Sequence, residues 1–151
     1  MSLQAELINP FLTSSIQVIE TIIQVRPKIG TLRIQQIHYS HDCVWLKIRI
    51  YGQVEKDILF GFPEIAAKNI VSMMLGGYAV HELDDMCRSA VAELGNMISG
   101  NASTLLYSNG ISVEITPPSI LTGDAFEWGK SAVTIPLEVE RLGGFDINII
   151  V

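Results

Sequence analysis

The sequence predicts an α+β fold, with an antiparallel sheet of about six strands and three helices, one of them long. Two observations predict this class. Apolar residues recur every three to four positions in three segments, and in the stretches between these segments apolar and polar residues alternate. The length of 151 residues fits a single domain, residues 1–151, with a sizeable core.

The first helix is predicted from Asn9 to Val25, where apolar residues follow helical spacing. Pro10 suits the first turn of a helix, and Pro27 closes the segment. The period then changes to two residues over three strands joined by short turns, which predicts an antiparallel meander. These strands are Leu32–Ile37, Val44–Tyr51 and Val54–Phe62.

A second helix is predicted to open at Pro63 and Glu64, and the pair Gly76–Gly77 ends it. The third and longest helix runs from about Asp84 to Tyr107. Its first two residues, both aspartates, suit a cap and a partner for the helix dipole.

The last part of the chain returns to strand patterns. A loop that begins with Pro117–Pro118 and reaches about Lys130 separates the first of these strands from the last two, and Gly143–Gly144 divides those two. The strands are Ile111–Ile115, Ser131–Glu138 and Phe145–Val151.

Composition and charge narrow the classes of function. Hydrophobic residues make up 48% of the chain and charged residues 17%, so much of the chain must be buried. A subunit contact is one place where part of that surface could be covered. The net charge of −6 argues against nucleic acid, which rewards basic patches. No apolar run reaches the roughly 18 residues of a membrane span, and residues 1–6 lack the features of a signal peptide. Cys43 and Cys87 are therefore expected to be free thiols in a reducing cytoplasm.

The long helix carries a polar stripe. With about 100° per residue, the stripe residues point within roughly 40° of the Ser89 direction, and apolar residues occupy the opposite side. The stripe comprises Glu82, Asp85, Ser89, Glu93, Asn96, Gly100 and Ser103. The apolar side comprises Cys87, Val91, Leu94, Ile98, Ala102 and Leu105.

Glu93 and Asn96 are the most informative pair in this stripe. Their spacing places them side by side on a helix. A carboxylate can pair with a cation on a partner, and a carboxamide can hold and orient a water molecule. Neither group is a strong nucleophile, so an enzyme built on them works by positioning. The same residue types also suit an ordinary solvated helix face, so the stripe alone leaves the function open.

Gly95 and Gly100 are unusual in a helix interior, where glycine costs up to about 1 kcal/mol relative to alanine. Because they flank Asn96, they are expected to let another backbone or a partner approach closely. Four methionines, in contrast, are expected to lie in the core. These are Met73, Met74, Met86 and Met97.

His38, His41 and Cys43 lie close together in the sequence and suggest a metal site. A structural zinc site needs four ligands with paired spacing, which this segment lacks. The two histidines are therefore expected to be turn residues, and no metal site is predicted.

Ser89-x-x-x-Glu93-x-x-Asn96 forms a motif that is followed by Asn101 and, some twenty residues on, by Pro117–Pro118. On these residues the chain resembles the CheC/CheX-type phosphatases of bacterial chemotaxis. The opening Asn-Pro-Phe helix, the strand meander and the closing strands are similar to that family's layout from about residue 8 to 151. The single copy of the motif makes the CheX branch the nearer match. The two prolines are expected to set a turn rather than to act in catalysis.

The resemblance implies a phosphatase that removes the phosphoryl group from the aspartyl phosphate of a CheY-type response regulator. It implies that Glu93 forms a salt bridge to the regulator's active-site lysine and that Asn96 orients the attacking water. The regulator would supply Mg²⁺, so no cofactor of this chain's own is expected. Ser89, Gly100 and Asp85 are expected to contact the partner. CheX-type proteins are typically dimers, which implies a homodimer.

A second interpretation is a binding module without chemistry. The middle domain of the flagellar switch protein FliM has a similar fold and lacks phosphatase activity, so this chain could bind a phosphorylated regulator without hydrolysing it. The presence of both Glu93 and Asn96 favours the enzyme. Which regulator is the target, and whether it serves chemotaxis or another two-component pathway, stays open.

Overall fold

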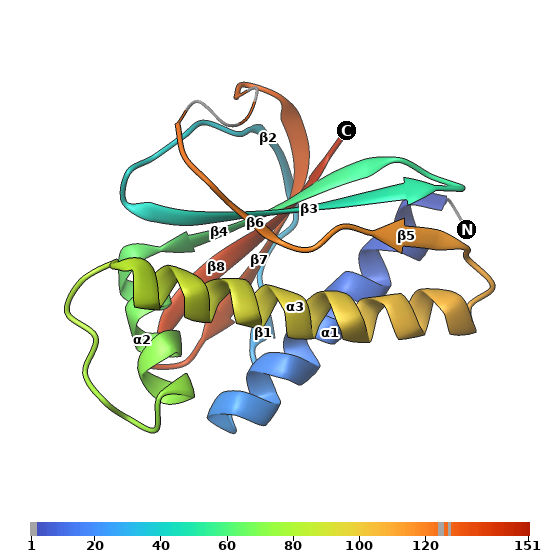
Figure 1. The fold of residues 1–151 in the computed structure, drawn as a ribbon. Coiled ribbons are helices and arrows are strands. Elements are labelled where there is room, and N and C mark those ends of the chain that lie inside the picture. Colours follow the sequence, from blue (N-terminus) through green and yellow to red (C-terminus); the bar gives the residue numbers. More distant parts are fainter. Residues whose placement is uncertain (1–2, 124–125, 127) are drawn as a thin grey trace.

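The computed structural model of the chain describes residues 3–123, 126 and 128–151. Within them, eight strands form one antiparallel sheet and three helices lie together on one of its faces (Figure 1), which confirms the predicted α+β class. The helices are α1 (Leu3–Ile23), α2 (Glu64–Met74) and α3 (Asp85–Ser108). The strands are β1 (Lys28–Ile29), β2 (Arg33–Gln36), β3 (Cys43–Gly52), β4 (Lys56–Pro63), β5 (Val113–Ile115), β6 (Ser119–Leu121), β7 (Ser131–Val139) and β8 (Gly143–Ile150).

The sheet has the order β1-β7-β8-β4-β3-β5, with β2 also paired to β7 and β6 also paired to β3. The prediction of about six strands was too low because β1 and β6, with two and three residues, are too short to show an alternating pattern. The predicted meander was also wrong. Strands β3 and β4 form a hairpin, but β2 pairs with the distant β7. Ile34 of β2 is 77% exposed, so β2 lacks the buried face that would specify its neighbour.

Helix α1 begins six residues earlier than predicted, at Leu3 instead of Asn9. Leu7 explains the extension because it is buried in the core between the helices and the sheet. Pro10 therefore lies inside the helix and not in its first turn, where the missing N–H removes one backbone hydrogen bond. Gln24, with φ of 59°, ends the helix before Pro27.

Two apolar clusters hold the layers together. The larger one lies between the sheet and the three helices, and a smaller one around Trp45, Leu59 and Leu121 lies on the opposite face of the sheet. Of the loop predicted up to Lys130, residues 124, 125 and 127 fall outside the described residues. Among the described helices, none combines the length and the apolar character that crossing a bilayer requires.

Helix α3 is fixed at several points along its length, and these contacts position the site described below. Asp84 is the predicted N-cap, and its side chain accepts a hydrogen bond of 2.9 Å from the Cys87 backbone N–H. In the middle of the helix, an added Cβ at Gly95 would overlap Leu46 of β3. Farther along, the Asn101 amide donates a 2.8 Å hydrogen bond to Gln17 of α1. Gly95 therefore allows the close approach that the sequence predicted, and the neighbours that approach it, Leu46 and Pro118, belong to this chain.

Candidate active site on helix α3

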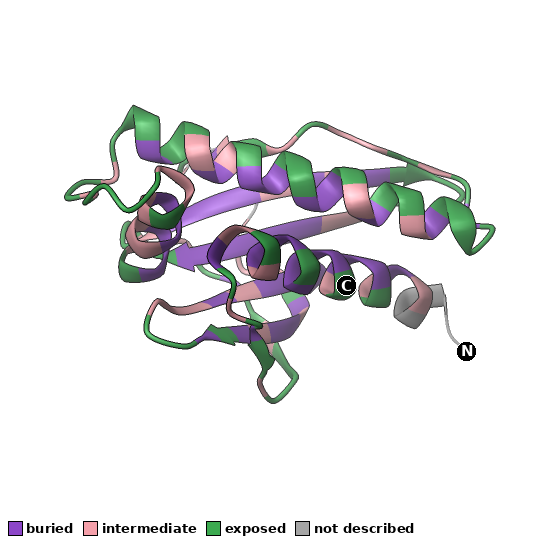
Figure 2. Cartoon of the chain, turned by 90° about the horizontal axis from the view of Figure 1, so that it is seen from below, coloured by how far each residue is buried: buried purple, intermediate pink, exposed green. Residues whose placement is uncertain are grey.

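The solvent-facing side of α3 carries the polar stripe that the sequence predicted. Figure 2 shows exposed residues along the outer side of α3 and buried residues on the side that meets the sheet. The exposed stripe residues on the helix are Asp85, Ser89, Glu93, Asn96, Gly100 and Ser103. Glu82 is also exposed, but it precedes the N-cap Asp84, so its predicted place on the helix face was wrong. The opposite side is buried as expected, except that Leu106 is fully buried in place of the half-buried Leu105.

Glu93 and Asn96 share this face, and no hydrogen bond or ion pair joins either side chain to another described residue. Asp85 differs because it lies 3.7 Å from the Arg88 guanidinium. At about 1.5 Å per residue, Asp85 is roughly 12 Å from Glu93 along the helix axis, whereas Ser89 is about one turn away. The structure thus brings Ser89, Glu93 and Asn96 together and leaves Asp85 at the edge of the group.

A cleft of about 340 Å³ adjoins Asn96 on the side of α3 that faces β5 and β6. Its helix wall comes from Asn96, Ser99, Gly100 and Ser103, and its opposite wall is residues 113–118. In Figure 1, β5 and the segment that follows it run alongside α3. Pro117 and Pro118 line this wall, so they shape the surface next to Asn96 in addition to ending a strand.

Two methionines flank the stripe on its other side, which the sequence interpretation missed. Met86 is 59% exposed and Met97 is 38% exposed, so the expectation that they belong to the core was wrong. Met73 of α2, at 41% exposed, was misplaced in the same way. At about 100° per residue, Met86 and Met97 both point within roughly 40° of Glu93. The carboxylate therefore lies beside exposed apolar surface, which the helical angle of each methionine could have indicated.

Asn101, which follows the motif, does not join the site. Its amide is committed to the hydrogen bond with Gln17 on α1, and the residue is half-buried. Its role in the described structure is to join two helices. Asn96 is thus the amide on α3 that is free to meet a partner.

The described residues contain no group of three or more histidine, cysteine, aspartate and glutamate side chains placed to hold a metal ion. His41 instead stacks edge-on against Tyr39, with ring centroids 5.1 Å apart. Burial, with a further contribution from Asp146, raises the pKa of the Cys43 thiol, which disfavours the thiolate that a metal would need.

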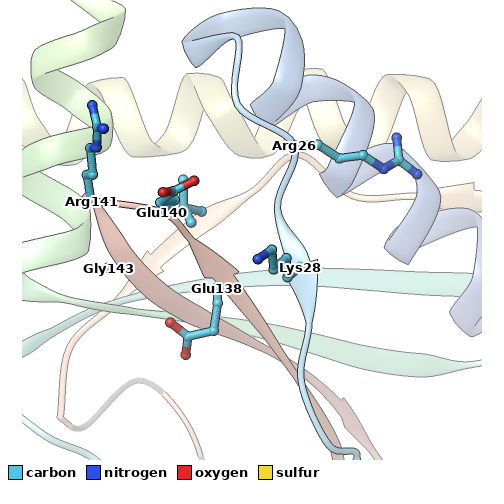
Figure 3. A pocket seen from close by; sticks show the side chains of 7 residues that line it. Arg26, Lys28, Glu138, Glu140, Arg141 and Gly143 are labelled. Carbon is cyan, nitrogen blue, oxygen red and sulfur yellow. The ribbon is translucent and has the colours of Figure 1, made fainter.

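A second cavity, of about 360 Å³, lies at the turn between β7 and β8. Figure 3 shows that the Arg26 and Arg141 guanidinium groups there point away from one another. Glu138, Glu140 and Lys28 add charges of both signs to its wall. The charged groups do not converge on a common ligand, so the α3 stripe remains the candidate active site.

The chemistry open to this stripe follows from its groups. Asn96 offers an amide oxygen and two N–H donors, and Glu93 offers a carboxylate on an exposed surface. Neither group forms a covalent intermediate readily. The arrangement suits a reaction in which the partner brings the reactive bond and this chain positions a water molecule and a charge.

Comparison with known proteins gives matches along the whole chain. The family model described as "Chemotaxis phosphatase CheX" matches residues 44–138. The CheY-P phosphatase CheX of Thermotoga maritima is 30% identical over 150 residues, which cover 97% of this chain and 96% of that protein.

Solved structures agree in fold. A CheC-like superfamily protein from Shewanella sp. PV-4 superposes with a TM-score of 0.82 at 24% identity, covering 99% of this chain and 98% of that one. CheX in the CheX–CheY–BeF3–Mg²⁺ complex of Borrelia burgdorferi superposes with a TM-score of 0.75 at 24% identity, covering 95% and 96% of the two chains.

Proposed function

This chain belongs to the CheX family of chemotaxis phosphatases, and we propose that it hydrolyses the aspartyl phosphate of a CheY-type response regulator. One observation carries the proposal: Glu93 and Asn96 lie exposed and side by side on α3, without partners among the described residues. The name of the Thermotoga relative, a CheY-P phosphatase, supports this substrate.

In the proposed mechanism, Glu93 pairs with a lysine beside the regulator's phosphoaspartate and so places α3 over that site. The Asn96 amide then holds a water molecule in line with the bond between phosphorus and the aspartyl oxygen. The water oxygen forms a bond to phosphorus as that bond breaks, which leaves the regulator's carboxylate and dihydrogen phosphate. Phosphoryl transfer depends mainly on alignment and charge stabilisation, so two positioning groups suffice.

The divalent ion in this proposal belongs to the regulator. The relative from Borrelia burgdorferi is described in a complex that contains CheY, BeF3 and Mg²⁺. We therefore assign Mg²⁺ to the partner, where it offsets the phosphoryl charge, and no step to a metal bound by this chain. Three further stripe residues, Ser89, Gly100 and Asp85, are proposed to contact the regulator's surface around this site.

We also propose that residues 1–151 act as one domain. Two copies of this domain are proposed to form a homodimer through the β1–β2 edge of the sheet. Both strands pair with β7 alone among the described strands, so their outer side is an open edge. Ile29, Leu32 and Ile34 at this edge are 48%, 53% and 77% exposed. Pairing with a second copy would cover this apolar surface and remove the open edge.

The size of the protein in solution tests this part of the proposal. Light scattering after size-exclusion chromatography is expected to give twice the 16.6 kDa chain mass for the wild type. Ile34→Lys places a charge at the edge and is expected to give the monomer. A monomeric wild type would refute the homodimer.

We propose the reducing cytoplasm as the location of the protein, because Cys43 and Cys87 are both free thiols.

Loss of phosphoryl group from a phosphorylated CheY-type regulator of the same organism, with and without this protein, tests the enzymatic function. The wild type is expected to accelerate the loss, whereas folded Asn96→Ala and Glu93→Ala variants are not. A wild type that binds the phosphorylated regulator and leaves the rate unchanged would show a non-catalytic binding module. A protein that does neither would point to a different receiver domain.

A further inference from the structure

The cleft beside Asn96 contains a polar group that the proposed mechanism does not use. Ser99 is only 8% exposed, and its hydroxyl oxygen has no hydrogen-bond partner. Two other hydroxyl groups on α3 find partners: Thr104 donates to the Gly100 carbonyl at 3.2 Å, and Ser108 donates to the Thr104 carbonyl at 3.0 Å. The Ser89 and Ser103 hydroxyls have no partner among the described residues, but those two residues are exposed to water. A buried hydroxyl without a partner is costly. Ser99 lines the cleft, and its hydroxyl oxygen is hidden from solvent behind that wall.

Gly100 lies in the same wall, one turn beyond Asn96. An added Cβ there would meet no atom of the chain within 4 Å, in contrast to Gly95, where it would overlap Leu46. The fold therefore needs glycine at 95 and has no steric need for glycine at 100. Glycine in an exposed helix interior weakens the helix, and no close packing within the chain offsets that cost at position 100.

The opposite wall of the cleft is largely uncharged. Pro117 and Pro118 offer rigid apolar surface, and Thr116 already accepts a 2.9 Å hydrogen bond from the Arg49 backbone N–H through its hydroxyl oxygen. Glu114 is the one charged residue among those that line the cleft. These walls suit a neutral peptide segment better than a charged small molecule. The volume, about 340 Å³, falls in the range of roughly 300–1,000 Å³ typical of ligand pockets.

We infer that the cleft binds a main-chain segment of the phosphorylated regulator, namely the loop that borders its phosphoaspartate. This inference rests on the proposed function, since Asn96 belongs both to the reaction site and to the cleft wall. Any protein that brings a phosphoaspartate to Asn96 must also lie over the adjoining cleft. In the complex, the Ser99 side chain rotates about χ1 so that its hydroxyl, hidden from solvent in the free protein, hydrogen-bonds a peptide group of that loop. Gly100 lets the loop's backbone approach α3 closely.

Steady-state kinetics with the phosphorylated regulator test the inference through Ser99→Ala and Gly100→Ala, with Ser108→Ala as the matched control. Ser108 lies at the far end of α3, outside the cleft. Both cleft variants are expected to raise KM about fivefold to tenfold, the loss that one weakened hydrogen bond or one obstructed contact produces. Their kcat should stay within about twofold of the wild type, and their melting temperatures should be unchanged or higher, because neither change removes a contact within the chain. The control loses its own hydrogen bond to Thr104 but lies outside the cleft, so it should match the wild type in KM and kcat.

The outcomes separate this inference from the function on which it rests. If the wild type is active and both cleft variants keep the wild-type KM, the cleft does not bind the regulator's loop, and the phosphatase function still stands. A fall in kcat at unchanged KM also overturns it, because the two residues would then align Asn96 instead of binding the loop. A wild type without activity or binding toward the regulator removes both the proposed function and this inference.

Discussion

Pro118 packs against the backbone of Gly95, the residue immediately before Asn96: a Cβ at Gly95 would lie 3.1 Å from the Pro118 Cγ atom. The same Cβ would overlap Leu46 of β3. The sheet and the segment before β6 thus hold α3 from two sides at the point where the proposed catalytic amide emerges. A water-positioning amide needs such a fixed backbone, because small displacements of a positioning group reduce the rate strongly.

The two helical glycines are predicted to respond in opposite ways to alanine. Gly95→Ala should lower the free energy of unfolding by about 1–3 kcal/mol, since the added methyl group overpacks a filled site. Gly100→Ala should raise it by up to about 1 kcal/mol, since its Cβ meets open space and alanine favours the helix. Urea denaturation of both variants checks this pair. Equal stability of Gly95→Ala and the wild type would contradict the packing described for α3.

Asn96 and Glu93 are predicted to affect different kinetic constants. Asn96→Ala should lower kcat by about 100-fold, since it removes the group that is proposed to align the water. Glu93→Ala should act mainly by raising KM, because the lysine contact proposed for Glu93 would form on docking. Both variants should keep their free energy of unfolding within about 0.5 kcal/mol of the wild type, because both side chains are exposed and contribute no ion pair within the described chain. Chemical denaturation and single-turnover kinetics distinguish these expectations from simple unfolding.

The charge of Glu93 is predicted to make the activity depend on salt. Raising the ionic strength screens exposed ion pairs, so the wild-type KM should rise between low and high salt. Glu93→Gln keeps the side chain's shape and loses its charge, so its KM should start higher and change less. If KM rises equally with salt in both proteins, another charged group directs the docking and the lysine contact assigned to Glu93 is wrong.

Met86 and Met97 are predicted to bind the regulator through apolar contact beside Glu93. Replacing both with serine should raise KM several-fold. Docking would bury the two exposed methionine side chains, and serine lacks the apolar surface that gains from this burial. Met73→Ser on α2 is the matched control, because it is similarly exposed but lies outside α3. Titration calorimetry with a non-hydrolysable mimic of the phosphorylated regulator would measure the difference in dissociation constant. Unchanged affinity in the double variant would exclude this side of the stripe from the interface.

The polar face of α3 could be predicted from the sequence. The apolar residues of the helix repeat with the helical period, and the side opposite to them must face solvent. The packing of Gly95 could not, because Leu46 and Pro118 lie far from it in the sequence and only the folded chain brings them together. Methionine carries little positional information, since it suits both a core and a protein-binding surface, and this is why Met86 and Met97 were misplaced.

The strand pairing was also predictable only where the paired segments are close in the sequence. The β3–β4 hairpin followed from a short turn between two alternating segments, and this part of the meander was correct. The pairing of β2 with β7 depends on a long-range contact that no local turn signal encodes. The sheet edge that we propose for dimerisation therefore became visible only in the structure, and the homodimer itself stays a prediction.

Asp146 on β8 is predicted to make stability depend on pH. Burial raises the pKa of this carboxyl above its ordinary value, and the ion pair with Arg33, at 3.2 Å, only partly offsets that effect. The folded state therefore holds the Asp146 proton more tightly than the unfolded state does. As pH rises from below the ordinary aspartate pKa of about 3.9 and through the raised value, this group's contribution to the free energy of unfolding falls.

Asp146→Asn should remove the loss of unfolding free energy that ionisation of this carboxyl causes. Relative to the wild type, the variant should gain stability at pH 7, where the wild-type carboxyl is ionised, and should gain none at about pH 3, where it is protonated. Denaturant unfolding of both proteins at the two pH values measures the difference. Asp57→Asn, which breaks the 3.1 Å ion pair with Arg49, is the control that should lose stability at pH 7. A variant at Asp146 that is less stable than the wild type at pH 7 would mean that the Arg33 ion pair outweighs the cost of burying the carboxylate.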